Sequence, residues 1–347
     1  METAYLTWNE TKSAAAKIRE GAIVVFPTET VYGIGCLPNQ ACAEKLAQAK
    51  GRPDGKPFTL MCATLTQVAQ YCEIDCGIVA AAQAFMPGEV TFLLKARKGI
   101  DPSIDLGTGV VGVRVPNSDE VRAMIEEVGS PLLVSSANLS GEKPAASFDE
   151  AKSYFSNRVD AIVEGVCVSS VPSTIVDFAK GAPKLIREGS VPFEIIKDVY
   201  LYASESVSLG CDHGGLAYKN AIAEHLSQRG FKVLDCGCDT PASVDYPVHG
   251  KAAAKKVVSG EASLGVVVCT SGEGIAMAVN KVPGARCGIG YDDVAAGKTR
   301  EHNNANLIAF GQKYMDLEDV LRRVDIFLIE KFSPEEKHHR RVRLLEE

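Results

Sequence analysis

From about residue 203 onward, short apolar segments alternate regularly with longer amphipathic ones, and this alternation constrains the possible fold more than any other feature. The apolar segments are VSLGC, FKVLD, LGVVVC, ARCGIGY and LIAFG, and helical patterns occur at 215–229, 248–259, 274–279, 292–300 and 316–332. Strands that are each separated by one helix pair in parallel. The sequence therefore predicts a parallel, Rossmann-like α/β sandwich in residues 203–347.

The first half has a different organisation, because several of its strand patterns follow one another without an intervening helix. Helical patterns at 10–20, 40–50, 64–72, 77–86 and 118–128 are mixed with extended segments such as GAIVVF, FTLMCA, EVTFLLKA, GVVGVRVP, PLLVSS, STIVDF and APKLIREG. Runs of adjacent strands favour a mixed sheet. We therefore expect residues 1–198 to form a separate α/β domain with a twisted mixed sheet and helices.

Bulk composition narrows the classes of function. A length of 347 residues fits about two domains, and a net charge of −7 argues against broad nucleic-acid binding, although it leaves room for a local basic groove. The sequence has no apolar run long enough for a membrane span and no signal-peptide core. Eleven cysteines without a CxxC pair predict reduced thiols and no metal site in a cytoplasmic protein.

The histidines are distributed unevenly, since all six lie at or after His213. Any chemistry in the first 200 residues must therefore proceed without imidazole. This points to positioning of a nucleotide or acyl group in the first half and leaves histidine-based proton transfer to the second.

A candidate site in the second half starts at Cys269, which ends a buried strand and opens the turn CTSGEG. Backbone N–H groups of such a turn bind an anion, and the following helix N-terminus would stabilise a thiolate at Cys269. Asp212 and His213 follow the first strand, and His302 and Asn303 lie near the fifth, so we expect all of them at the carboxyl edge of the sheet. Taken alone, the turn and the cysteine fit a purely structural role equally well.

The order of the motifs GCDHGG, DYP, VVVCTSGEGIAMAVNKVPGAR, REHNNANLIAFG and HHRRVR resembles the ribose-5-phosphate isomerase B (LacAB/RpiB) family. The resemblance implies metal-free isomerisation of ribose 5-phosphate through an enediol, at a site built between the subunits of a homodimer or larger homo-oligomer. It implies that Cys269 is the base, that Ser271 and His302 assist ring opening, that Gly272 and Gly274 hold the enediolate, and that Asp212, His213, Asn303, Lys337 and Arg341 bind the sugar phosphate.

Three positions depart from the pattern of that family. Lys337 stands where arginine is frequent, Thr270 replaces a frequent glycine, and Glu273 adds a carboxylate to the turn. Glu273 is either a competing base or, as we favour, a solvated turn residue. An aldose 6-phosphate of the allose or galactose type is the alternative substrate.

Hydroxyls, an amide and fixed cations form the candidate site of the first half. Lys50 and Arg52 follow a helix two residues apart, so both can reach one polyphosphate, and Ser136 and Asn138 follow a buried strand. Arg187 ends a short strand and can pair with the same anion. Each has a structural alternative: Lys50 as a helix C-terminal cation, Ser136 and Asn138 as turn formers.

As an ordered set, PTETVYGIG, KGRPDGKPFTLMC, SSANLSGE, PSTIVDF and LIREGS resemble the YrdC-like threonylcarbamoyl-AMP synthases over residues 10–195. The resemblance implies that L-threonine, bicarbonate and ATP with Mg²⁺ are converted to threonylcarbamoyl-AMP and pyrophosphate for modification of adenosine 37 in tRNA, with tRNA-modification proteins as partners. The matching residues are Thr28 and Tyr32 in the threonine pocket, and Lys50, Arg52, Ser136, Asn138, Ser173 and Arg187 around the nucleotide and threonine.

One departure leaves the function of the first half open. Met61 stands where many synthases have a threonine-binding histidine, and FTLMC is closer to the YciO branch. A YciO-like nucleotide- or RNA-binding domain with weak or no synthase activity is therefore the alternative. A further alternative makes one half a scaffold that serves only oligomerisation.

Overall fold

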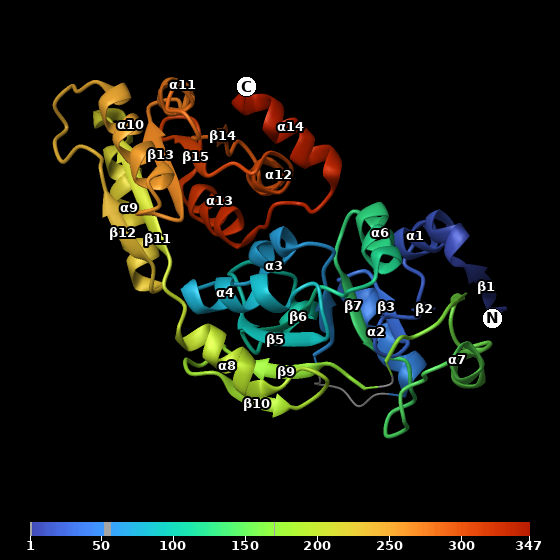
Figure 1. The fold of residues 1–347 in the computed structure, drawn as a ribbon. Helices are drawn as coiled ribbons and strands as arrows, with labels where there is room; N and C mark the ends of the chain where they lie inside the picture. The colour runs from blue at the N-terminus through green and yellow to red at the C-terminus, as the bar shows by residue number, and fades with distance from the viewer. Residues whose placement is uncertain (1, 52–56, 170) are drawn as a thin grey trace. The chain divides into compact units, whose positions relative to one another are not determined.

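The computed structural model describes residues 2–51, 57–169 and 171–347. The chain divides into two compact units (Figure 1). The first comprises Met1–Glu73 and Ala84–Asp198, and the second comprises Ile74–Gln83 and Val199–Glu347. Among the described residues, no helix is both long and apolar enough to cross a lipid bilayer.

The first unit is built on a mixed sheet whose described strands follow the order β1-β8-β2-β3-β7-β4-β6-β5-β9-β10. The strands are β1 (Ala4–Thr7), β2 (Val24–Phe26), β3 (Gly33–Cys36), β4 (Thr59–Met61), β5 (Val90–Lys95), β6 (Val110–Arg114), β7 (Leu132–Ser136), β8 (Ala161–Glu164), β9 (Thr174–Asp177) and β10 (Lys184–Arg187). The sheet contains both parallel pairs, such as β4–β6, and antiparallel pairs, such as β3–β7. The predicted mixed sheet is confirmed.

Helices connect these strands, and several begin at a side-chain cap. In chain order they are η1 (Trp8–Glu10), α1 (Thr11–Arg19), α2 (Gln40–Lys50), α3 (Leu65–Tyr71), α4 (Cys76–Phe85), α5 (Pro102–Asp105), α6 (Asp119–Val128), α7 (Phe148–Phe155) and α8 (Phe193–Leu201). Most of α4 belongs to the second unit, although it lies between strands of the first in the sequence. Asn39 accepts a bond from the backbone of Cys42 to start α2, and Ser118 starts α6 in the same way.

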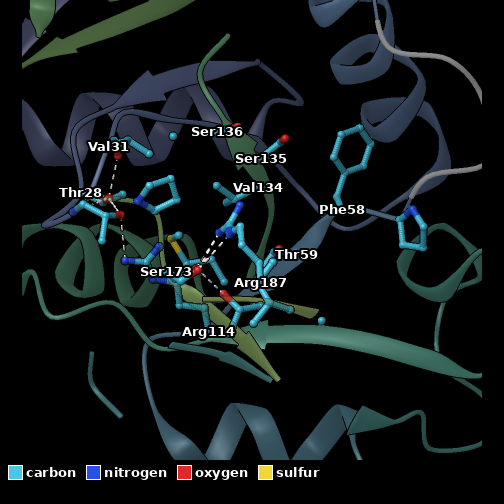
Figure 2. Close-up of a pocket in the computed structure, with 18 of the residues that line it drawn as sticks. Thr28, Val31, Phe58, Thr59, Arg114, Val134, Ser135, Ser136, Ser173 and Arg187 are labelled. Atoms are coloured by element: carbon cyan, nitrogen blue, oxygen red, sulfur yellow. Dashed lines mark hydrogen bonds between the residues drawn. The ribbon is translucent and has the colours of Figure 1, made fainter. Parts of the chain in front are cut away.

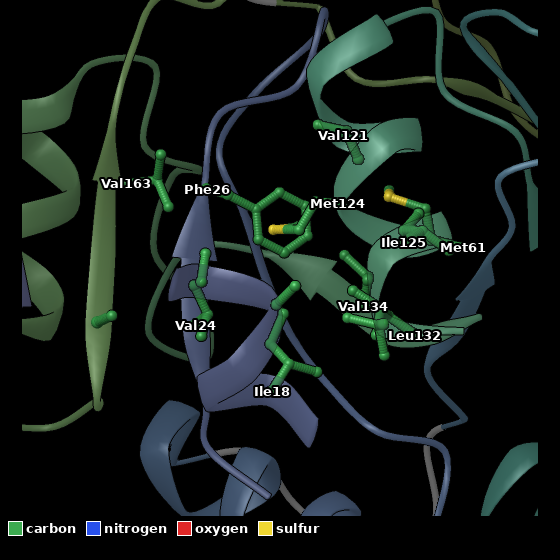
Figure 3. Close-up of a cluster of buried hydrophobic side chains, with 14 of the residues drawn as sticks. Ile18, Val24, Phe26, Met61, Val121, Met124, Ile125, Leu132, Val134 and Val163 are labelled. Atoms are coloured by element: carbon green, nitrogen blue, oxygen red, sulfur yellow. The ribbon is translucent and has the colours of Figure 1, made fainter. Parts of the chain in front are cut away.

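One apolar cluster holds the helices to this sheet (Figure 3). Ile18 of α1 and Met124 and Ile125 of α6 pack against Phe26 of β2 and Val134 of β7. All five are buried. Their packing fixes the strand ends that line the cavity described below.

The second unit has a five-stranded parallel sheet in the order β12-β11-β13-β15-β14, as the alternating pattern predicts. Its elements are β11 (Ser206–Cys211), η2 (His213–Gly215), α9 (Leu216–Gln228), β12 (Lys232–Asp235), α10 (Tyr246–Val258), β13 (Leu264–Cys269), α11 (Glu273–Val279), β14 (Cys287–Ile289), α12 (Asp293–Asn303), β15 (Leu307–Gly311), α13 (Leu317–Ile329) and α14 (Glu336–Glu346). Helices α10 and α11 pack against each other and on β13, whereas α13 packs against α9 and α12.

Candidate active sites

A cavity of about 430 Å³ lies in the first unit, lined by side chains from strands β4 to β7, β9 and β10 (Figure 2). Of the residues predicted from the sequence, five line it: Thr28, Tyr32, Ser136, Ser173 and Arg187. Segments far apart in the sequence therefore converge on one cavity. Arg52 lies outside the described residues.

Arg187 is held against one wall of this cavity by Ser173 (Figure 2). Its Nη2 and Nε donate to the Ser173 carbonyl oxygen at 2.8 and 3.1 Å, and the Ser173 hydroxyl lies 2.9 Å from that of Thr91. Burial lowers the pKa of the Arg187 guanidinium, and the nearby charge of Arg114 lowers it further. Two guanidinium groups in one cavity favour an anionic ligand.

Arg114 is a functional candidate that the sequence analysis missed. Its Nη2 donates to Glu29 Oε1 at 2.8 Å and to Thr30 Oγ1 at 3.0 Å, and the backbone N–H of Asn117 also donates to Glu29 Oε1 at 2.9 Å. Within the described part of the chain, Arg114 Nε and Glu29 Oε2 are buried without a hydrogen-bond partner. The sequence contained a signal for this residue, because Arg114 is a charged residue at the end of the apolar strand pattern GVVGVRVP.

Lys50 and Asn138 support the cavity wall from behind and do not line it. Lys50 is the last residue of α2, and its Nζ donates to the carbonyl oxygens of Ser136 and Asn138, the latter at 2.8 Å. The Asn138 side chain accepts a bond from the Ser136 hydroxyl at 2.6 Å and donates to the carbonyl oxygens of Leu139 and Glu142. These contacts match the turn-forming alternative for Ser136 and Asn138.

The hydroxyls of Thr28 and Tyr32 are bonded to the backbone around the cavity. Thr28 Oγ1 donates to the Val31 carbonyl oxygen at 2.7 Å, and Tyr32 Oη donates to that of Gly165 at 2.7 Å. Burial raises the pKa of Tyr32 to about 12. Met61, the residue that departs from the synthase pattern, also lines the cavity and is buried.

The second candidate site lies at the topological switch point of the parallel sheet, between the neighbouring strands β11 and β13. Asp212 follows β11 and accepts a bond from the Gly214 backbone at 3.0 Å, and His213 Nδ1 accepts one from the Val244 backbone at 3.1 Å. Cys269 ends β13, where its Sγ lies 3.1 Å from the backbone nitrogen of Gly272. The Gly272 N–H donates to this sulfur.

The turn after Cys269 depends on Gly272, which has a φ of +84°. A Cβ on this residue would lie 3.0 Å from the backbone carbon of Phe310. We expect Gly272→Ala to cost about 1–3 kcal/mol and to lower the kcat of the reaction expected at Cys269, because strain and contact both displace the N–H beside the sulfur.

Gly260 provides the matched control, since its φ is +78° but no atom lies within 4 Å of the position that a Cβ would take. Gly260→Ala should cost only the backbone strain of about 1–2 kcal/mol and leave kcat unchanged. Urea unfolding and initial rates check both variants. Equal losses of kcat in the two variants would contradict the role given to the turn.

The expected placement of His302 and Asn303 at the carboxyl edge beside Cys269 is wrong within a single chain. Both lie in the last turn of α12, before β15 begins at Leu307. A helix that follows a parallel strand returns the chain to the amino edge of the sheet, so its end lies opposite the edge that carries Cys269.

The remaining predicted residues belong to helices α11 and α14 or to the turn between β13 and α11. Lys337 and Arg341 are exposed on α14, and Lys337 forms an ion pair with Glu335 at 2.6 Å. Ser271 Oγ accepts a bond from the Glu273 backbone at 3.4 Å, and the Glu273 side chain is exposed, as the solvated alternative predicts.

Tyr246 is a second residue that the sequence analysis missed, although its motif DYP was noted. It begins α10, and its ring lies so close to Gly274 that a Cβ there would be 2.9 Å from the ring carbon Cζ. Gly274 is therefore required for this close approach, and Tyr246 borders the turn that carries Cys269. No group of three or more metal-ligating side chains occurs among the residues described.

Comparisons with known proteins match the two parts of the chain separately. The profile of the Sua5/YciO/YrdC family, described as telomere recombination, matches residues 16–189, and that of the LacAB/RpiB family, described as ribose/galactose isomerase, matches residues 207–345. Ribose-5-phosphate isomerase B of Mycobacterium tuberculosis (strain CDC 1551 / Oshkosh) is 42% identical over 142 residues, which cover 41% of this chain and 88% of that protein.

The first part is similar to YciO proteins. The uncharacterized protein YciO of Escherichia coli K12 is 30% identical over 175 residues, covering 50% of this chain and 85% of that protein. The crystal structure of E. coli YciO superposes with a TM-score of 0.51 at 27% identity, over 55% of this chain and 98% of that one. The chain therefore belongs to the Sua5/YciO/YrdC family through its N-terminal part and to the LacAB/RpiB isomerase family through its C-terminal part.

Proposed function

We propose that the second unit interconverts ribose 5-phosphate and ribulose 5-phosphate. The observation that carries the proposal is Cys269 at the sheet switch point, with its sulfur 3.1 Å from the Gly272 backbone nitrogen. A thiolate there removes the C2 proton and returns it to C1 while the carbonyl moves from C1 to C2. The N–H groups of the turn stabilise the negative charge of the enediolate intermediate. The relative named ribose-5-phosphate isomerase B supports this substrate over a six-carbon aldose phosphate.

A second copy of the chain completes this site in our proposal. His302 and Asn303 end α12 at the sheet edge opposite Cys269, so they reach a substrate only in a neighbouring subunit. His302 would then protonate the ring oxygen, and Lys337 and Arg341 would bind the phosphate. Mixing a Cys269→Ala chain with a His302→Ala chain tests this, because mixed dimers regain one intact site. Failure to regain activity in proven mixed dimers would contradict a shared site.

For the first unit we propose formation of threonylcarbamoyl-AMP, pyrophosphate and water from L-threonine, bicarbonate and ATP bound with Mg²⁺. Arg187 and Arg114 face one cavity and offer charge stabilisation for phosphate and carboxylate groups without any imidazole. The full chain should release pyrophosphate from ATP only when threonine and bicarbonate are both present. Arg187→Gln should lose this reaction while its urea unfolding curve, followed by the fluorescence of Trp8 in the same unit, stays close to that of the wild type. Retained isomerase activity shows in addition that the second unit is intact.

The alternative is a YciO-like domain that binds a nucleotide or RNA without synthase activity. It is favoured by one observation, that the buried Met61 lines the cavity in place of a polar imidazole. Nucleotide or RNA binding without threonine-dependent release of pyrophosphate would establish this alternative. Met61→His then shows whether the imidazole alone separates the two activities.

A further inference from the structure

Two imidazole rings are stacked where α14 packs against the end of α12. The ring centres of His302 and His338 are 4.2 Å apart, and their planes differ by 15°. His302 lies in the last turn of α12, with its side chain 39% exposed. His338 is only 3% exposed. One ring of the pair is thus open to a substrate, and the other is enclosed beneath it.

The enclosed ring of His338 is not held by hydrogen bonds. Neither of its nitrogens has a hydrogen-bond partner among the residues that the structure describes, and the carboxylate oxygen Oε1 of Glu335 lies 3.9 Å from Nε2, beyond hydrogen-bond distance. In contrast, His225 lies 2.7 Å from Asp325, and His249 lies 2.9 Å from the carbonyl oxygen of Cys236. Leaving a buried polar group without a partner costs about 1–3 kcal/mol. Hydrogen bonding therefore does not explain an imidazole at position 338, whereas its flat contact with His302 does.

The charged side chains that the structure describes near the two histidines form ion pairs with one another and do not hydrogen-bond to His302. Lys298 pairs with Glu301 at 2.6 Å on α12, and Lys337 pairs with Glu335 at 2.6 Å at the start of α14. The nearest carboxylate oxygen, on Glu301, is 3.9 Å from His302 Nε2, which is beyond hydrogen-bond distance. The face of His338, in contrast, lies flat against the His302 ring.

We propose that His338 is a positioning residue that orients the imidazole of His302 by stacking. This inference rests on the isomerase function proposed above, in which His302 gives a proton to the ring oxygen of the sugar and later takes it back. Such a transfer requires the ring nitrogen within hydrogen-bond reach of that oxygen. A misplacement of about 1 Å can lower a rate by up to about 10²-fold. Without the stacked partner, the exposed ring of His302 samples other rotamers.

Steady-state kinetics of the full chain with ribose 5-phosphate provide the first test. We expect His338→Ala to lower kcat at least about tenfold with little change in KM, and His338→Phe to restore most of kcat because it keeps a flat ring. His339→Ala is the matched control, since His339 packs on Phe332 at 4.4 Å. An unchanged kcat in His338→Ala, equal losses in the Phe and Ala variants, or an equal loss in His339→Ala would overturn the proposal.

NMR of the imidazole ring protons separates this proposal from the proposed function. Burial lowers the pKa of His302, with Lys298, His338 and Lys337 acting in the same direction and Glu301 opposing them. In His338→Ala, the His302 signal should lose its ring-current shift, and its pKa should rise as water gains access. His302→Gln identifies the signal. If the wild type turns over no sugar phosphate but the His302 signal and pKa still change in His338→Ala, the proposed isomerase function is wrong and the stacking contact is supported. If the His302 signal does not change, the positioning role of His338 is contradicted, whatever the activity.

Discussion

Cys269→Ala is expected to lower the kcat for ribose 5-phosphate by about 10²–10⁴-fold, the range that a positioned general base contributes. The thiol is buried at the end of β13, beside the backbone N–H of Gly272. In the reaction proposed above, its deprotonated sulfur accepts the proton from C2. Coupled detection of ribulose 5-phosphate measures the loss.

The fold should survive this change, because the side chain loses only one sulfur atom from a small apolar cluster. Cys287→Ala is a matched control, since Cys287 packs against the same cluster but lies on β14, away from the switch point. Burial raises the pKa of the Cys287 thiol, so this residue stays an uncharged packing group at neutral pH. Normal turnover by Cys269→Ala, or an equal loss of kcat in Cys287→Ala, would contradict the assignment of Cys269 as the base.

Arg114→Leu is expected to destabilise the first unit by about 3–5 kcal/mol, because it leaves the buried carboxylate of Glu29 without its cation. Both side chains are more than nine-tenths buried, and their ion pair measures 2.8 Å. The only tryptophan, Trp8, packs against the apolar cluster of this unit. Urea unfolding followed by tryptophan fluorescence therefore reports on the first unit.

Two further variants test the cause of that loss. Glu29→Gln combined with Arg114→Leu should recover part of the stability, because no unpaired charge remains buried. Lys152→Gln, which removes an exposed ion pair with Asp149, should change stability by less than about 1 kcal/mol. If Arg114→Leu cost no more than Lys152→Gln, the pair would not be a structural element of the cavity.

The parallel sheet was predictable because its strands are apolar and each is followed by an amphipathic helix. The same pattern placed Cys269 and Asp212 at neighbouring strand ends. The prediction for His302 was wrong because the residue is close to β15 in the sequence, and that closeness does not determine at which edge of the sheet α12 ends. For helix α14 the sequence indicates only a basic tail, since its run of charged side chains hides the single buried position, His338.

The sequence predicted that the first unit has a mixed sheet, but it did not predict all of the strands. Strands β1 and β8 were missed, and they pair with each other although 157 positions separate their partners Ala4 and Ala161. Such four-residue segments are too short for a visible alternation, and tertiary pairing makes them strands. Lys50 was expected to bind an anion directly. The local sequence could not show that its ammonium group would donate to the carbonyl oxygen of Ser136, which is 86 positions away.

The two guanidinium groups of Arg114 and Arg187 affect how the first cavity responds to a change of pH. Both groups stay charged through ordinary shifts in acidity, although Arg114 is paired with Glu29, and Tyr32 stays uncharged because its pKa is raised to about 12. The isomerase reaction proposed for the second site, in contrast, needs groups that gain and lose protons. We therefore expect acidification of the medium to slow the reaction at the second site while the two arginines of the first cavity keep their charge.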